Sequence, residues 1–420
     1  MTKGSGAMEQ GAFPADFLWG TASAAHQVEG GNVNSDCWVL EHVPGTPWVE
    51  PSGDACDHYH RYEQDIALFA ALGFNAYRFS IEWARIEPEV GEFSLAALDH
   101  YRRMLEACHR HNLTPIVTYH HFTSPRWFAA RGGWEVMANV PLFARFCERA
   151  TAHLGDLIGA ACTLNEPNVG LLLRALGFWP ADDEIPTMPL RVAAARAVGA
   201  ETFGSFHTAR QDLAAPVYIE AHRQAVAAIK AEAGTVPVGM TLALQEYQAV
   251  EGGEEARDRI RGAVEAPFLA AARGDDFLGV QTYSRIRVGP DGVLGPEPGV
   301  ELTMMDYEFW PEALEATIRY AAAATGGPII VTENGVATDD DARRVEYIRR
   351  ALDGVRRCLV EGIPVLGYCY WSIFDNFEWS LGYRPTFGLI AVDRATRERT
   401  VKPSARWLGE VARTNGAASS

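Results

Sequence analysis

Basic side chains are scarce in this sequence, which has 37 Lys and Arg against 54 Asp and Glu and a formal net charge of −17. Proteins that bind nucleic acid usually present a Lys- and Arg-rich face that neutralises phosphates, and no basic run here is long enough to form one. No apolar stretch reaches the roughly 20 residues of a membrane-spanning helix, and the first residues lack the apolar segment of a signal peptide. We therefore expect a cytoplasmic protein with neither a nucleic-acid nor a membrane partner.

Paired cysteines and metal-binding patterns are also missing. The seven cysteines are odd in number and form no C-x-x-C motif, which is typical of reduced, buried thiols. The H-x-H pairs at His58 and His109 fall in stretches with helical periodicity, where positions i and i+2 do not share a face. We expect no bound metal and no cofactor. The G-x-S-x-G, P-loop and H-E-x-x-H motifs are absent as well. The sequence therefore does not support a serine hydrolase, a phosphoryl-transfer enzyme or a metalloprotease.

No linker rich in Pro, Gly and Ser divides the chain, so we expect one catalytic domain at 13–413 with flexible tails at 1–12 and 414–420. Eight short apolar runs recur in this domain, several of them near-continuously apolar, as strands buried on both faces are. The runs are Phe17–Ala25, Asn75–Trp83, Thr114–Phe122, Ala161–Pro167, Val236–Leu244, Asp276–Ser284, Pro328–Gly335 and Val365–Asn376.

The stretches between these runs carry helix signals. Apolar residues at helical spacing follow the first run and end at Gly73, and a second such stretch begins after Ser94, a suitable N-cap. Strands that alternate with helices indicate a parallel sheet, and eight units predict an α/β fold, a single (β/α)8 TIM barrel with elaborated βα loops. An open doubly wound sheet is the alternative, but the glycine-rich turn that usually follows its first strand is absent.

Polar and aromatic residues cluster where the predicted strands end, and in a barrel these ends meet at one mouth. Two carboxylates stand out there, Glu166 at the end of the fourth run and Glu333 at the end of the seventh. Glycoside cleavage needs such a pair, because one carboxyl protonates the leaving oxygen while the other attacks the sugar carbon or activates water. Their separation decides between retention and inversion of the anomeric configuration, and the residues alone leave both outcomes open.

Six segments appear in order along the chain. They are FLWGTASAAHQVEG (17–30), YRFSIEWARIEP (77–88), VTYHHFTSPRWF (117–128), TLNEPN (163–168), VTENG (331–335) and YWSIFDNFEW (370–379). Together they resemble glycoside hydrolase family 1, the retaining β-glucosidase family, from Phe13 to about Arg413. A lone N-E-P or E-N-G would be a weak signal, but six ordered segments at strand ends are very specific.

The resemblance implies a retaining mechanism on a small-molecule β-glycoside, with Glu333 as nucleophile and Glu166 as general acid/base. It places Arg78 beside Glu333, where a cation favours the ionised carboxylate, and Gln281 in a supporting position. It further implies that Tyr283 bonds the same carboxylate and that the sugar is bound by a shell of polar and aromatic side chains. The members of this substrate-binding shell are Gln27, His121, Asn165, Tyr283, Trp371, Glu378 and Trp379.

Several positions depart from the family pattern. The family usually has Asn at Gln281 and Tyr at Thr282, commonly Tyr at His26 and Arg near Thr386, and in many members Trp at Phe122. Gln281 is the departure nearest to the chemistry. The segment 177–215 also fits the family less well, and two interpretations of it stay open: a rim loop that shapes the aglycone side, or cover for the barrel.

These observations predict an exo-acting β-glycosidase, with β-glucosides as the preferred substrates and β-galactosides or β-fucosides as alternatives. Two other functions are alternatives. A non-catalytic sugar-binding protein on the same barrel is motivated by Gln281 and Thr386. A 6-phospho-β-glycosidase is disfavoured because Glu378-Trp379 is retained and no lysine stands nearby. The sequence leaves the oligomeric state open, a homo-oligomer included.

Overall fold

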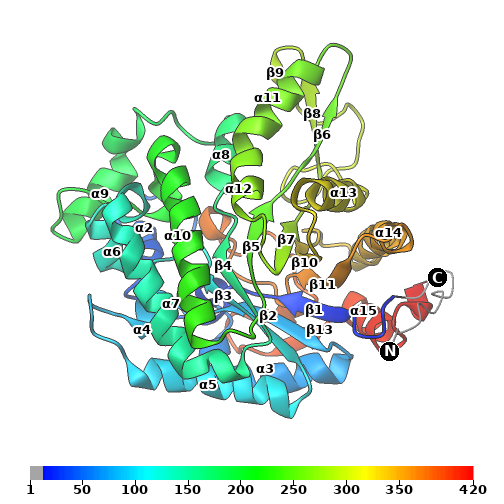
Figure 1. The fold of residues 1–420 in the computed structure, drawn as a ribbon, viewed down its shortest axis with the longest axis horizontal. Helices are drawn as coiled ribbons and strands as arrows, with labels where there is room; N and C mark the ends of the chain where they lie inside the picture. The colour runs from blue at the N-terminus through cyan, green and yellow to red at the C-terminus, as the bar shows by residue number, and fades with distance from the viewer. Residues whose placement is uncertain (1–12, 420) are drawn as a thin grey trace.

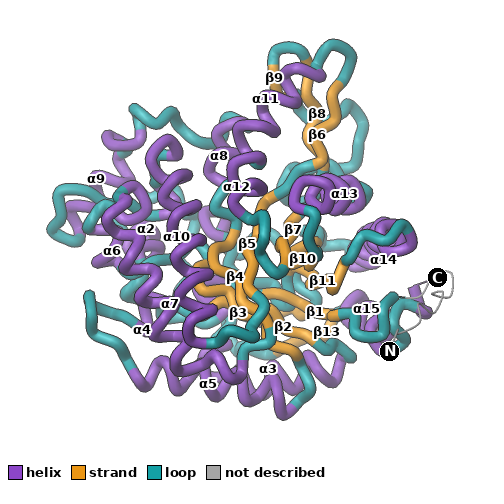
Figure 2. The backbone as a smooth tube through the Cα atoms, in the orientation of Figure 1, coloured by secondary structure: helices purple, strands orange, loops and turns teal. Residues whose placement is uncertain are grey.

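The computed structural model describes residues 13–419, so the predicted tail at 1–12 lies outside the described residues. Its centre is a closed barrel of eight parallel strands surrounded by helices (Figures 1 and 2). The order around the barrel follows the order along the chain, and β1 closes it by pairing with β11. The strands are β1 Leu18–Ala22, β2 Ala76–Ser80, β3 Thr114–His120, β4 Ala160–Asn165, β5 Val238–Ala243, β7 Phe277–Gln281, β10 Ile329–Asn334 and β11 Val365–Trp371.

Each of the eight apolar runs supplies one barrel strand, so the predicted TIM barrel is confirmed and the open doubly wound sheet is wrong. Every residue of β2, β4, β5, β7 and β10 is buried. Such strands pack on the barrel interior with one face and on the surrounding helices with the other, which explains their near-continuous apolar character.

Small side chains pack the barrel interior. Ala76, Cys162 and Cys369 belong to one buried cluster that includes Trp371 at the end of β11. A Cβ atom added to Gly20 would lie 2.8 Å from the Cys369 sulfur, so only glycine fits there. The interior is a packed core rather than a channel, which leaves the polar strand ends as the place for a substrate.

Helices cover the outside of the barrel, and two predicted helix boundaries are confirmed. The Ser94 side chain accepts a hydrogen bond from the Ala97 N–H at the start of α5, and Gly73 ends α3 with a left-handed φ of 113°. The helices are α1 Ala25–Val28, α2 Asp36–His42, α3 His58–Leu72, α4 Trp83–Ile86, α5 Leu95–Arg110, α6 Arg126–Ala130, α7 Val140–Leu154, α8 Val169–Ala175, α9 Pro189–Ala197, α10 Gln211–Glu232, α11 Glu254–Val264, α12 Ala266–Ala271, α13 Ala313–Thr325, α14 Asp341–Val360 and α15 Pro403–Arg413. None of the described helices is both long and apolar enough to span a bilayer.

Two small sheets lie outside the barrel. Strands β6 Glu246–Ala249, β8 Arg285–Gly289 and β9 Gly292–Val293 form a lobe that projects at the top of Figure 1 beside α11. Strands β12 Ile390–Val392 and β13 Arg399–Val401 form a hairpin. Within the stretch predicted as a C-terminal tail, Asn415 accepts from the Trp19 indole N–H at 2.9 Å, which ties this stretch to β1.

Candidate active site

A continuous set of hydrogen bonds joins the carboxyl ends of four barrel strands. Arg78 on β2 donates to Glu333 on β10 at 2.6 Å and to Asn165 on β4 at 2.5 Å. The Gln281 amide on β7 donates to the same two side chains, at 2.8 Å to Asn165 and 2.9 Å to Glu333. All four residues are at most 4% exposed. Barrel closure therefore gathers residues that are far apart in the chain into one buried polar cluster.

Three donors converge on the Glu333 carboxylate. Oε1 accepts from Arg78 and Gln281, and Oε2 accepts from the Tyr283 hydroxyl at 2.6 Å. Burial raises the pKa of Glu333, whereas the Arg78 guanidinium and the Tyr283 hydrogen bond oppose that rise. The donors stabilise the ionised form of this carboxyl and fix its orientation.

Glu166 follows β4 directly and is held in a turn. Its φ is 44°, a conformation that few residues other than glycine adopt, and its backbone N–H donates to the Thr241 carbonyl oxygen at 2.9 Å. Burial raises the pKa of Glu166 well above its usual value, and repulsion from Glu333 and Glu378 adds to the rise. Because the cationic and hydrogen-bonding partners gather on Glu333, the shared proton of the pair resides on Glu166.

The residues predicted to bind sugar lie next to this pair. The Gln27 amide donates to Glu378 at 3.2 Å, and the His121 ring lies 5.6 Å from the Trp371 ring with an angle of 17° between the planes. Burial and the nearby Arg78 lower the pKa of His121 well below its usual value. The neutral imidazole therefore accepts from the Asn165 amide at 3.2 Å and keeps an N–H at Nδ1.

Some of these side chains have buried polar atoms that remain available. Gln27 Oε1, His121 Nδ1 and Gln281 Oε1 have no hydrogen-bond partner among the described residues. Buried polar atoms are nearly always paired, so two acceptors and one donor are in place for ligand hydroxyls. Aromatic rings beside fixed polar atoms form the surroundings that a sugar needs.

Trp379 contacts residues that sequence reasoning did not place at the site. His26 is parallel to its ring at 5.9 Å, and His207 lies 4.9 Å from it. His207 belongs to the 3-10 helix Phe206–Thr208 in the segment 177–215, so this segment reaches the site. Phe122, which replaces the usual tryptophan, also packs on Trp379 at 5.3 Å. A histidine outside the predicted strands carries no local signal that separates a site wall from ordinary packing.

Two other departures from the family pattern lie in structural contacts. The Thr282 hydroxyl donates to the Leu244 carbonyl oxygen at 3.1 Å. The Thr386 hydroxyl donates to the Thr338 carbonyl oxygen at 3.0 Å, and its own carbonyl oxygen accepts from Arg344 at 2.7 Å. Arg344 is 1% exposed. A buried guanidinium from α14 therefore lies beside the position where the family commonly has its arginine.

The comparisons with known proteins agree with this architecture. A model of glycosyl hydrolase family 1 matches residues 9–264 and 278–417. The chain belongs to this family. Beta-glucosidase A of Acetivibrio thermocellus is 30% identical to it, over 96% of this chain and 99% of that relative. As a family 1 member the protein is a glycoside hydrolase, and the resemblance seen in the six segments is confirmed.

Solved structures extend the agreement to three dimensions. The crystal structure of a beta-glycosidase is 56% identical to this family 1 chain with a TM-score of 0.93, covering 96% of this chain and 97% of the other. A beta-glucosidase from Thermotoga maritima in complex with cyclophellitol is 26% identical with a TM-score of 0.84, covering 96% and 99%. The barrel and the elaborated loops therefore belong to a fold that the family shares.

Glu378 is expected to destabilise the folded enzyme at neutral pH. Burial, with added repulsion from Glu333, raises its pKa to about 8 from a usual value of 4.5. The unfolded chain then releases this proton at lower pH than the folded one, so stability falls as the pH rises from about 4.5 to about 8. We expect Glu378→Gln to increase the free energy of unfolding by about 1–3 kcal/mol at pH 7 and by far less at pH 4.5. Urea unfolding at both pH values measures this, and an equal gain at both would contradict the raised pKa.

Proposed function

We propose that this family 1 enzyme is a retaining β-glucosidase that releases terminal β-D-glucosyl residues by double displacement. Glu333 is the nucleophile and Glu166 the general acid/base. One observation carries the proposal: two buried carboxyls repel each other, yet only Glu333 is bonded to Arg78 and Tyr283. Such a pair separates into one ionised and one protonated group, which is the starting state that glycoside cleavage requires.

In the first step, Glu166 transfers its proton to the glycosidic oxygen while Glu333 attacks the anomeric carbon. A bond forms between a Glu333 oxygen and that carbon, and the bond to the glycosidic oxygen breaks with its electron pair on the oxygen. The aglycone leaves as a neutral alcohol. Asn165, held by Arg78 and Gln281, would bind the sugar 2-hydroxyl, a contact that strengthens in the transition state.

In the second step, Glu166 becomes a base. The ester has removed the negative charge of Glu333, so repulsion from Glu333 no longer adds to the effect of burial on the pKa of Glu166, and this pKa falls. Glu166 accepts a proton from water, the water oxygen bonds to the anomeric carbon, and the bond to Glu333 breaks. Glu333 is released as a carboxylate and Glu166 regains its proton. Two inversions at one carbon give net retention.

The sugar preference rests on the binding shell and on the relatives. Gln27, His121, Glu378 and Trp379 would bind hydroxyls, with Trp371 as the platform under the ring. The similar proteins are named beta-glucosidases or 1,4-beta-D-glucan glucohydrolase. β-Galactosides and β-fucosides differ from β-glucosides only around carbons 4 and 6, and they are secondary substrates in this proposal.

The other functions suggested by the sequence have weaker support. A sugar-binding barrel that has lost catalysis would be expected to lose the contacts made at position 281. The Gln281 amide, however, donates to both Asn165 and Glu333. A 6-phospho-β-glycosidase needs cations for the phosphate. Here the side chain near that position is the Glu378 carboxyl, which bonds Gln27 and supplies no cation for a phosphate.

The test combines a panel of p-nitrophenyl glycosides with proton NMR of the first-formed sugar. We expect the β-glucoside to have the highest kcat/KM and β-glucose to appear before mutarotation produces the α-anomer. First release of α-glucose would reject the double displacement. Inactivity on the whole panel would instead favour a sugar-binding barrel, and turnover restricted to 6-phosphoglycosides would favour the phospho-enzyme.

We further propose that the protein works in the cytoplasm. All seven cysteines are free and buried in the described structure. Reduced thiols of this kind are typical of proteins in a reducing compartment.

A further inference from the structure

A buried pair of hydrogen-bonded side chains lies directly behind the proposed sugar-binding wall. His26 in α1 donates through Nε2 to Glu41 in α2 at 2.6 Å, and both side chains are fully buried. The second Glu41 oxygen accepts from the backbone N–H and the hydroxyl of Ser52, at 3.0 and 2.8 Å. The His26 Nδ1 lies 3.0 Å from the Asn32 amide nitrogen. The imidazole ring is therefore held at both nitrogens and cannot turn without losing a hydrogen bond.

The fixed ring contacts the segment that carries Glu378 and Trp379. It is parallel to the Trp379 ring within 4° at 5.9 Å, and it meets Phe377 edge-on at 6.0 Å. The next residue, Gln27, donates to the Phe377 carbonyl oxygen at 2.7 Å. Trp379 has a φ of 51°, and a residue with a side chain keeps this conformation only when its surroundings hold it. Two consecutive residues of α1 supply that support.

We propose that His26, fixed by Glu41, is a positioning residue that holds Glu378 and Trp379 in their sugar-binding arrangement. The inference rests on the proposed β-glucosidase function, because it concerns the binding wall of the same site. The His26–Glu41 bond and the donors on Glu333 form separate sets. The pair is therefore expected to control substrate affinity and to leave the chemical step largely unchanged.

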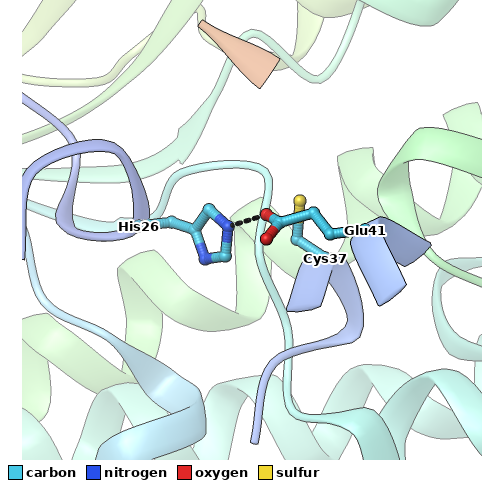
Figure 3. A group of neighbouring side chains, drawn as sticks. All are labelled: His26, Cys37 and Glu41. Carbon is cyan, nitrogen blue, oxygen red and sulfur yellow. Dashed lines mark hydrogen bonds and ion pairs between the residues drawn. The ribbon is translucent and has the colours of Figure 1, made fainter. Parts of the chain in front are cut away.

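Cys37 completes a group of three side chains that could bind a metal, with possible ligand atoms within 4.8 Å of one another (Figure 3). The hydrogen bond drawn in Figure 3 already occupies His26 Nε2 and Glu41. Burial and the neighbouring Glu41 and Asp36 raise the pKa of the Cys37 thiol well above its usual value, whereas a metal binds the thiolate. The geometry thus favours a hydrogen-bonded support, and Cys37 offers a control position.

The positioning contact is expected to depend on pH. The titratable groups that face His26 are Glu41 and Asp36 of α2, Glu82 at the start of α4, and His207. Burial alone lowers the pKa of His26, but the carboxylates, led by Glu41, raise it above 6.5. In the charged ring Nδ1 is also an N–H, which the Asn32 amide can accept only through its oxygen, an atom with no other partner among the described residues. The ring loses this positive charge as the pH rises through the raised pKa. A neutral ring bonds a carboxylate less strongly, so KM should increase on the alkaline side.

The test compares His26→Phe, Glu41→Gln and His26→Tyr with the wild type on p-nitrophenyl β-glucoside. We expect the first two variants to raise KM about tenfold, because each loses one hydrogen bond and a tenfold change corresponds to the free energy of such a bond. The kcat should change by at most about threefold. His26→Tyr keeps a donor for Glu41 and should stay near the wild-type KM, without the alkaline increase. Titration of active sites with a 2-deoxy-2-fluoroglucoside counts folded enzyme, so that misfolding is not mistaken for weak binding.

The control variant Cys37→Ser should leave KM and its pH dependence unchanged. A fall in kcat at constant KM in His26→Phe and Glu41→Gln would overturn the positioning role. One equivalent of zinc in the purified protein, lost in Cys37→Ser, would overturn it as well. A wild type that hydrolyses no β-glycoside would reject the proposed function instead, and the affinity of the same variants for glucose, followed by tryptophan fluorescence, would then decide the positioning role.

Discussion

Glu333→Ala is expected to lose hydrolysis of p-nitrophenyl β-glucoside by a factor on the order of 1,000,000, the scale seen when a nucleophile is removed from an enzyme. Glu333 is the carboxylate on which Arg78, Gln281 and Tyr283 converge. Without it, no oxygen is held by these donors against the anomeric carbon. The measurement is kcat/KM, with circular dichroism to verify that the variant is folded.

Rescue by azide distinguishes the loss of a nucleophile from other causes of inactivity. A small anion can occupy the space of the missing carboxylate and attack the anomeric carbon directly, so we expect partial rescue with α-glucosyl azide as the product. Glu87→Ala is a matched control, because Glu87 is another fully buried glutamate paired with an arginine, Arg145. It should lose stability without any response to azide. Full activity of Glu333→Ala would refute the assignment.

Glu166→Ala is expected to show a loss that depends on the leaving group. Removing a general acid costs about 100- to 10,000-fold where the aglycone needs a proton. An alkyl β-glucoside should lose about 1,000-fold, whereas 2,4-dinitrophenyl β-glucoside, whose leaving group needs no proton, should still form the glycosyl-enzyme rapidly. Azide then attacks this intermediate from the other face, so the product should be β-glucosyl azide. Rates for the two substrates and NMR of the azides provide the measurement.

The pH profile tests the same residue independently. Burial and the negative Glu333 raise the pKa of Glu166 well above its usual value, so its deprotonation sets the alkaline limb of kcat/KM. That limb should disappear in Glu166→Ala. Equal losses for both substrates, or α-glucosyl azide from this variant, would show that the roles of Glu166 and Glu333 are reversed.

The barrel could be predicted from local patterns. A strand buried on both faces is mostly apolar along its length, and the run at Val236–Leu244 has this character, as the fully buried β5 Val238–Ala243 shows. Helix boundaries such as Ser94 and Gly73 are equally local, because a cap needs a side-chain acceptor or a left-handed residue at one position. In a closed parallel barrel the strand ends must meet at one mouth, so the site could be placed before its geometry was known.

Other parts of the molecule left no such signal. The lobe of β6, β8 and β9 was not predicted, because its strands are short and only partly buried. The sequence shows His26 only as a departure from the family pattern and gives no sign of Glu41 as its partner, because their pairing depends on how α1 and α2 pack. Gln281 looked like a weakening departure from the family pattern, yet its amide bonds both Asn165 and Glu333. Its longer side chain reaches both partners, which the residue type alone could not indicate.

The sequence by itself determined the barrel, the family and the two carboxyls at the strand ends, because periodicity, capping and motifs are properties of neighbouring residues. Only the tertiary structure decided which partners each carboxyl meets, and therefore which one is stabilised as the anion and which one keeps the proton. Arg78, Tyr283 and Glu333 come from the ends of different strands, and barrel closure brings them together. Arg78 and Tyr283 each donate a hydrogen bond of 2.6 Å to Glu333. The pKa of a carboxyl depends on its burial and on the charges within a few ångströms in space. Positions along the chain do not indicate which charges those are.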